Sequence, residues 1–230
     1  MTKTNLLKIL IISLLLIFGC SNKQKNTEVK REISTAQKIA NAAGIKKWDS
    51  VNSLAFTFNV KIGKKEIHRS WYWEPKNDIV KFYSAGRKDS TVFSHNQIGK
   101  NSSPEIIKRD KQFINDSYWL LFPFHLIWDK NVDISVSDSF SKLPIGKRQA
   151  VKVIVKYSAD KGYTPNDVYD LYLDDNYKII EWAYHKNNSP VPNRVTKWID
   201  YKQIGGLNLS LNRPGKDDNF KVWFTDVTVK

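Results

Sequence analysis

Apolar and polar residues alternate along most of this chain, which is the pattern of β-strands with one buried face. Residues 54–60 show it first, with Leu54, Phe56 and Phe58 separated by smaller or polar residues. After a turn at 63–65 the same period returns, and Pro75 ends the second strand. The strands predicted in this way are 54–60, 67–73, 78–84, 90–96, 132–136, 150–158, 168–173, 177–185, 194–203, 207–211 and 220–229. The spacing favours an all-β meander of roughly ten strands.

Two turn signals define the predicted hairpins in the second half of the chain. Residues 174–176, Asp-Asp-Asn, separate the strands 168–173 and 177–185, and Gly205-Gly206 separates the strands 194–203 and 207–211. The short polar side chains and the glycines adopt the backbone angles of tight turns at little cost. We expect antiparallel neighbours at both places.

A helical period appears near the start, over residues 33–45. Ile33, Ala36, Ala40 and Ala43 recur at close to 3.6 residues. Ser34 or Thr35 can cap the N-terminus of this helix, and Gly44 can end it.

The middle of the chain breaks the alternation. Residues 104–116 are polar and either helical or irregular, and residues 118–128 carry nine apolar or aromatic residues around Pro123 and His125. Asn115 or Asp116 can cap this segment, and Pro123 lacks the N–H that a continuous helix needs. We therefore expect a helix, a kink and a second short helix, which either forms a lid over a concave sheet or belongs to its core. A segment that is apolar on all sides must be covered on all sides or must itself cover something.

The N-terminus combines a short basic region with a short apolar one. Lys3 and Lys8 precede an apolar run at residues 9–18 of about ten residues, whereas a membrane-spanning helix needs about 20. Gly19 and Cys20, the only cysteine, follow directly. This is typical of a secretory signal peptide, and residues 17–20, Ile-Phe-Gly-Cys, resemble the lipobox of bacterial lipoproteins.

The lipobox resemblance implies that Cys20 is lipidated and becomes the new N-terminus after cleavage. The alternative is a buried or free thiol at the end of an ordinary signal peptide. The predicted organisation is a signal peptide at 1–19, a lipidated cysteine with a flexible polar tether at 20–32, and a single domain at 33–230. The polar tether lacks hydrophobic periodicity, which favours disorder.

Composition narrows the possible partners. Lys and Arg number 37 against 23 Asp and Glu, for a formal net charge of +14, but the basic residues are scattered singly. Scattered charges favour a solvated surface with some attraction to anionic lipid head groups, and they disfavour a nucleic-acid partner. Aromatic residues make 13% of the chain, which suits a β core or an apolar ligand pocket.

No catalytic or metal-binding motif is visible. His68, His95, His125 and His185 lie far apart, and the chain has no G-x-S-x-G elbow and no phosphate-binding or dinucleotide glycine pattern. The acidic clusters at 174–176 and 217–219 lack the spaced ligands of a calcium loop, so turn chemistry explains them better. We expect no enzyme activity, no metal and no cofactor.

The order of these features resembles a known superfamily. A lipobox, an N-terminal helix, strands with alternating aromatics, an apolar helical insertion around 118–128 and a run of hairpins are similar to LolA/LolB-type half-barrels, which are periplasmic lipoprotein carriers and receptors. Residues 113–129 also resemble a segment of uncharacterised lipoproteins of Gram-negative bacteria. The protruding hydrophobic loop of the receptor has no match here.

The resemblance implies a mainly β fold: an antiparallel, strongly curved incomplete barrel whose concave face holds acyl chains. It also implies a lipid-anchored protein of the bacterial cell envelope, at the outer membrane and facing the periplasm. We expect a monomer that binds a lipid or acyl chain and handles envelope lipid or lipoprotein. The residues expected to form the cavity or its lid are Trp71, Trp73, Tyr118, Trp119, Phe122, Phe124 and Trp128.

Two other classes of function stay open from sequence alone. An accessory lipoprotein of an envelope complex would turn these aromatic side chains outward and use a sheet edge or an aromatic patch. A secreted hydrolase would assemble its site from distant residues.

Overall fold

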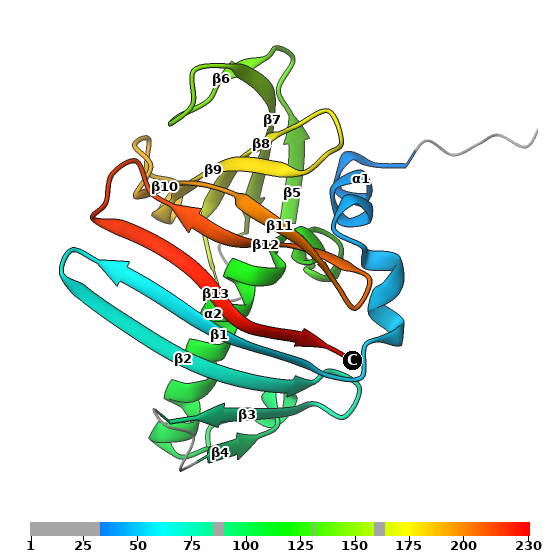
Figure 1. Cartoon of the computed structure of the whole chain (residues 1–230), viewed down its shortest axis with the longest axis vertical. Helices are drawn as coiled ribbons and strands as arrows, with labels where there is room; N and C mark the ends of the chain where they lie inside the picture. The colour runs from blue at the N-terminus through cyan, green and yellow to red at the C-terminus, as the bar shows by residue number, and fades with distance from the viewer. Residues whose placement is uncertain (1–32, 85–89, 131, 159–163) are drawn as a thin grey trace, which may run out of the picture. The chain divides into compact units, whose positions relative to one another are not determined.

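Two antiparallel sheets pack around one long helix in the computed structural model, which describes residues 33–84, 90–130, 132–158 and 164–230 (Figure 1). Sheet A has the strand order β11-β12-β13-β1-β2-β3-β4. Sheet B has the order β10-β9-β8-β7-β5, and β6 pairs with β7. Neither sheet closes into a barrel, which confirms the predicted mainly β, antiparallel, incomplete barrel. The predicted signal peptide, Cys20 and tether lie outside the described residues.

The helices and strands have the following bounds. The helical elements are α1 (Thr35–Ala42), η1 (Ile45–Ser50), η3 (His95–Gln97), α2 (Pro104–Trp128) and η4 (Lys186–Asn188). The strands are β1 (Leu54–Ile62), β2 (Lys65–Glu74), β3 (Ile79–Tyr83), β4 (Ser90–Phe93), β5 (Val132–Val136), β6 (Ser141–Lys142), β7 (Gln149–Tyr157), β8 (Val168–Leu173), β9 (Ile179–His185), β10 (Arg194–Lys197), β11 (Ile199–Ile204), β12 (Leu207–Pro214) and β13 (Phe220–Val229).

Sheet A joins the two ends of the described domain. β1 forms a hairpin with β2 and pairs on its other side with the last strand, β13, with Phe58 opposite Phe224. Inward-facing residues of these three strands follow the predicted alternation, because successive side chains of a strand point to opposite faces. The close pairing of the first and last strands places both inside one sheet rather than at its edges (Figure 1).

The hairpins predicted from turn chemistry are present. β8 and β9 pair across residues 174–176, where Asp174 Oδ1 accepts hydrogen bonds from the N–H groups of Asn176 (2.9 Å) and Lys178 (2.8 Å). Asp217 Oδ1 likewise accepts from the Asn219 N–H at 3.0 Å. Both acidic clusters are thus turns stabilised by side-chain acceptors, as the sequence indicated.

One predicted strand is divided. The expected strand 194–203 ends at Lys197 in sheet B and restarts at Ile199 in sheet A. Trp198, between them, is buried and donates its backbone N–H to the Ile180 carbonyl at 2.8 Å. Burial of this indole between the sheets fixes the crossover, and no glycine or proline marks it in the sequence.

The N-terminal helix α1 is present but shorter than the predicted 33–45, and the residues predicted to cap and end it flank it on either side. The Ser34 side chain accepts a hydrogen bond from the Gln37 N–H, and Gly44 follows the helix with φ of +93°. A Cβ at Gly44 would lie 2.6 Å from the Gly206 carbonyl oxygen, so this position needs glycine for space as well as for backbone angle.

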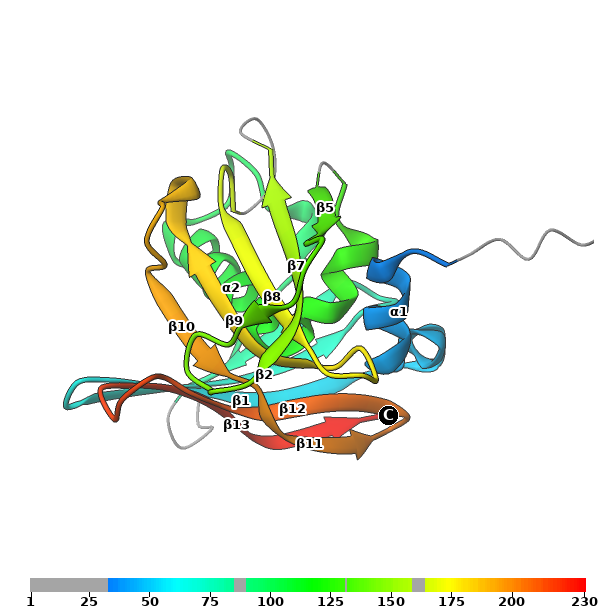
Figure 2. The same ribbon diagram turned by 90° about the horizontal axis from the view of Figure 1, so that it is seen from above.

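The central helix α2 is longer than the apolar segment that predicted it. Ser103 caps it and Pro104 occupies its first turn, so the polar residues 104–116 are helical. The kink falls at Leu121 (φ −111°, ψ 16°), two residues before Pro123, whose missing N–H interrupts the helical ladder. Figure 2 shows sheet A edge-on, with α2 and sheet B on one side of it.

Opposite faces of α2 belong to two different hydrophobic cores. Phe113, Leu120, Leu121 and Phe124 pack with the inner face of sheet A and with η1. Ile114, Tyr118, Phe122 and Leu126 pack with the inner face of sheet B and with α1. The helix is therefore the common wall of both cores, and most of its apolar segment is covered, with Ile127 left exposed.

Candidate functional site

A cavity of about 730 Å³ lies between the inner faces of the two sheets, where the N-terminal half of α2 crosses them. Its volume falls within the roughly 300–1,000 Å³ range of small-molecule sites. The lining residues are Phe58, Val60, Ile62, Ile67, Arg69, Lys111, Ile114, Asn115, Tyr118, Trp119, Thr164, Asp167, Tyr169, Trp182, Tyr184, Arg194, Phe220 and Val222. The wall is thus mainly aromatic and aliphatic, with a few charged groups.

Sheet A supplies one wall by simple alternation. Phe58, Val60 and Ile62 occupy every second position of β1 and face the cavity, and Phe220 and Val222 do the same on β13. β-branched and aromatic side chains at these positions suit a pleated surface. This wall requires no unusual local structure.

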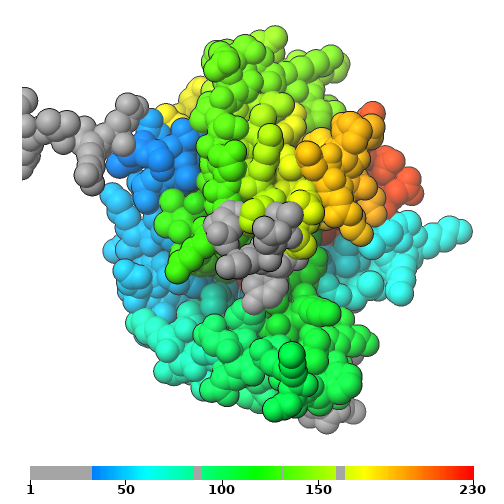
Figure 3. All heavy atoms as spheres, turned by 180° about the vertical axis from the view of Figure 1, so that it is seen from behind, coloured from blue at the N-terminus to red at the C-terminus, as the bar shows by residue number. Residues whose placement is uncertain are grey.

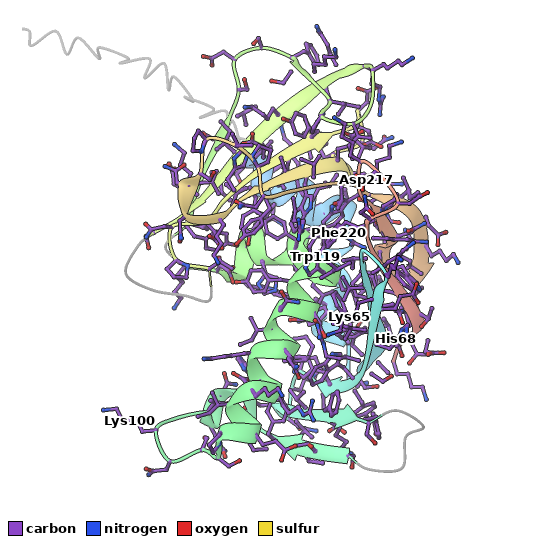
Figure 4. The ribbon with its side chains drawn as sticks, turned by 90° about the vertical axis from the view of Figure 1, so that its left-hand side faces the viewer. Lys65, His68, Lys100, Trp119, Asp217 and Phe220 are labelled. Carbon is purple, nitrogen blue, oxygen red and sulfur yellow. The ribbon has the colours of Figure 1, made fainter. Side chains whose placement is uncertain are left out.

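Sheet B and α2 supply the opposite wall, where Trp119 connects the two. The ring centroid of Trp119 lies 4.7 Å from that of Trp182 on β9 and 6.1 Å from that of Phe220 on β13. Figure 4 shows Trp119 on α2 and Phe220 on the neighbouring strand. Tyr169 packs against this group at a tilt, with its ring centroid 5.2 Å from that of Trp182. The aromatic rings form a continuous apolar surface.

A buried ion pair anchors α2 beneath the cavity. Arg69, on β2, donates to both carboxylate oxygens of Asp116, from Nε at 2.6 Å and Nη2 at 2.5 Å. Trp71 Nε1 and Asn115 Nδ2 also donate to Asp116, at 2.8 and 2.9 Å. Burial raises the pKa of Asp116, whereas the hydrogen bonds and the charge of Arg69 favour its ionised form. The fully buried carboxylate is therefore surrounded by donors.

A second polar cluster holds the ring of Tyr118, another cavity residue. Asp129 Oδ2 accepts hydrogen bonds from the hydroxyls of Tyr118 (2.6 Å) and Tyr157 (2.8 Å), and Asp129 Oδ1 lies 3.0 Å from His125 Nδ1. The imidazole of His125 stacks on the Tyr118 ring at 3.7 Å. Burial alone would raise the pKa of Asp129, but hydrogen bonds from His125, Tyr118 and Tyr157 bring it below its usual value.

The structure divides the sequence-predicted ligand residues between cavity and core. Tyr118 and Trp119 line the cavity. Trp71 and Phe124 are buried in the core between α2 and sheet A, where Trp73 and Trp128 are partly buried, and Phe122 is buried in the core between α2 and sheet B.

The sequence analysis missed the cavity residues that come from strands. These are chiefly Phe58, Val60, Tyr169, Trp182, Tyr184 and Phe220, together with the charged residues Arg69, Asp167 and Arg194. Their alternation predicted an inward direction but did not distinguish a packed neighbour from an open cavity. Arg69 offered one signal, since a charged residue on the apolar face of a strand requires a buried partner.

Histidines and acids do not gather into a metal site in the part of the chain that the structure describes. His95 contacts Asp110 at 2.5 Å, His185 contacts the Ser189 carbonyl at 2.8 Å, and His68 contacts Asn59 at 2.7 Å. Each of these histidines has its own separate partner. Among the described residues, no helix has the length and hydropathy needed to cross a membrane.

Comparison with known proteins yields fold likenesses at low identity. No family model and no curated protein matches the chain. A DUF1329 family protein from Desulfovibrio piger ATCC 29098 is 8% identical with a TM-score of 0.45, over 86% of this chain and 94% of the other. An outer membrane lipoprotein-sorting protein domain from Vibrio parahaemolyticus is 10% identical with a TM-score of 0.41, over 85% and 93%. At these scores the likeness supports no conclusion about function.

Removing the negative partner of Arg69 should destabilise the domain. Asp116→Asn leaves the guanidinium without a counter-charge, which costs about 3–5 kcal/mol for a buried pair. We expect this loss in the free energy of unfolding measured with urea. Replacing both partners, Arg69→Met with Asp116→Leu, should recover most of it. The control is Glu105→Gln, which removes the exposed Glu105 from its pair with the partly buried Arg109 at 3.6 Å and should cost under about 1 kcal/mol. An Asp116→Asn protein as stable as the wild type would contradict the role of this pair.

Stability should fall in acid partly through Asp129. Because its pKa in the folded protein is lowered, Asp129 stabilises the fold above its ordinary pKa, and this contribution disappears as the pH falls through the lowered value. Asp129→Asn should cost about 1–3 kcal/mol at neutral pH and should flatten the decline between about pH 5 and pH 2. Urea unfolding across this range measures both effects. Asp175→Asn, at an exposed hairpin tip, should keep the wild-type profile; an unchanged slope for Asp129→Asn would count against the assignment.

Proposed function

We propose that this protein is a membrane-anchored, non-enzymatic lipoprotein that binds an apolar ligand, a lipid or an acyl chain, between its two sheets. The observation that carries the proposal is the cavity of about 730 Å³ with its aromatic and aliphatic wall. If side chains filled the space between the sheets, that space would be ordinary hydrophobic core with no room for a ligand. An apolar cavity of this size, open to solvent at its edge, is suited to an apolar guest, because burial of apolar surface drives binding there.

The proposed setting is the bacterial cell envelope, at the outer membrane and facing the periplasm. The lipobox-like run at residues 17–20 supports it, since several acyl chains on Cys20, each buried CH₂ contributing about 0.8 kcal/mol, would hold the domain firmly on a membrane. A monomer tethered in this way could receive a lipid or a lipoprotein acyl group from its surroundings and shield it from water.

Filling the cavity should abolish binding without unfolding the domain. Ile67 is half-buried on β2 and lines the cavity, so Ile67→Trp places an indole in the space that the ligand would occupy. We expect affinity for the neutral dye N-phenylnaphthylamine to fall about tenfold or more, a change of roughly 1.4 kcal/mol, while the melting temperature changes little. Dye fluorescence with the full chain in a non-ionic amphipol measures the affinity.

The matched control is Val92→Trp, which adds the same side chain at an exposed position on β4. It should bind dye like the wild type. Equal dye binding by Ile67→Trp and the wild type would show that the cavity is not the site. Absence of dye binding by the wild type would contradict the proposed function itself.

The anchor is tested separately. Cys20→Ala removes the proposed acylation site and the cleavage cue together. Labelled fatty acid should then no longer enter the protein, and the uncut signal should remain, as seen by autoradiography and intact mass. Continued lipid incorporation by the variant would show that the anchor lies elsewhere.

A further inference from the structure

Of the charged side chains that line the cavity, some have a partner among the described residues that offsets or binds the charge and others do not. Four lining residues belong to the charged types Asp, Glu, Lys and Arg: Arg69, Lys111, Asp167 and Arg194. Arg69 is neutralised by its two hydrogen bonds with Asp116. Asp167 is buried and both of its oxygens are occupied, by the Tyr184 hydroxyl and the Asn187 N–H, each at 2.9 Å. The two remaining groups are cations.

Lys111 and Arg194 are exposed and line the cavity, so they mark its open edge. They come from different elements, α2 and β10. Within the described part of the chain, no carboxylate lies within 4.0 Å of either side-chain cation. Figure 3 shows the flank of α2, in green, on the surface of the molecule seen from behind.

Arg194 is also held against the apolar wall. Its guanidinium lies over the Phe220 ring, with Cζ 4.8 Å from the ring centroid, and its Nη1 donates to the Asn193 carbonyl at 3.1 Å. Stacking on an aromatic face orients a guanidinium and leaves its other N–H groups available. The Arg194 guanidinium is therefore a hydrogen-bond donor held in place at the boundary between the apolar cavity and solvent.

From this arrangement we propose that the ligand is an anionic amphiphile, with its apolar part among the aromatic rings and its carboxylate or phosphate between Lys111 and Arg194. This assignment rests on the proposed function and adds the chemical class of the ligand. Charge-assisted hydrogen bonds from lysine or arginine to a carboxylate or phosphate are short and strong. The formal net charge of +14 also attracts anions from a distance.

The test compares ligands that differ only in the head group. Laurate, dodecyl phosphate and the neutral dodecanol share one chain length and are titrated as competitors of N-phenylnaphthylamine. The full chain in a non-ionic amphipol is used throughout. Inorganic phosphate alone is the fourth competitor, because it separates a lipid head group from a free anion. We expect laurate and dodecyl phosphate to bind about tenfold more tightly than dodecanol, and phosphate alone not to compete.

Arg194→Gln and Lys111→Gln should each weaken laurate binding about three- to tenfold and leave dodecanol binding unchanged. The control is Lys100→Gln, in the exposed loop before α2 and away from Trp119 and Phe220 (Figure 4), which should leave both affinities unchanged. Raising the salt concentration should weaken laurate binding more in the wild type than in Arg194→Gln.

Each outcome has a distinct meaning. Equal affinities for laurate and dodecanol, or no effect of Arg194→Gln and Lys111→Gln, would overturn the anionic assignment and leave the apolar cavity as proposed. An equal loss in Lys100→Gln would assign the effect to net charge and overturn it as well. Competition by inorganic phosphate would indicate a small-anion site instead of an amphiphile site. If none of the chain ligands binds, the proposed function falls with the inference.

Discussion

The structure depends on one constraint: the C-terminal half of α2 is apolar on every side and must be enclosed. A single sheet can cover only one side of such a helix. Sheet A covers one face through Leu120, Leu121 and Phe124, and sheet B covers the opposite face through Phe122 and Leu126. The two sheets are therefore held apart by the helix that packs between them.

The cavity lies beside the part of α2 where the polar N-terminal half meets the apolar C-terminal half. Near Trp119 the helix still contacts both sheets, but one to two turns earlier it presents the exposed residues Lys111 and Asn115, and the Asn115 amide is bound to Asp116. A lysine does not fill the apolar space between two β-sheets, because burying its charge without a partner is costly. The gap persists for that reason, and the Arg69–Asp116 pair fixes the helix beside it. Because the charges of this pair offset each other, it secures the helix without leaving an unpaired charge on the cavity wall.

Alternation and turn residues were sufficient to predict most strands: 132–136, 168–173 and 220–229 agree with the structure at both ends. The division at Trp198 was not predictable, because the side chain that causes it is packed against strands remote in sequence. The cavity residues were difficult for a related reason. Phe56 and Phe58 share one strand, one face and one packed core, yet only Phe58 also lines the cavity between the sheets. Only the course of α2 distinguishes them, and that course is set by packing between distant segments.

Three arginines of this protein have different partners and different exposure to solvent. Arg69 is paired with a carboxylate, and Arg194 stands at the solvent edge over Phe220. Arg213 is fully buried, donates from Nη1 to the Ser210 carbonyl at 2.7 Å and stacks on Trp198 at 3.9 Å, and burial lowers its pKa to about 9. A cation that is buried or already paired contributes little to attracting a ligand, whereas one at the edge can exchange water for an anion at low cost. Of these three arginines, Arg194 alone is exposed beside the cavity, which is why the anionic ligand proposed above is assigned to it and not to Arg69 or Arg213.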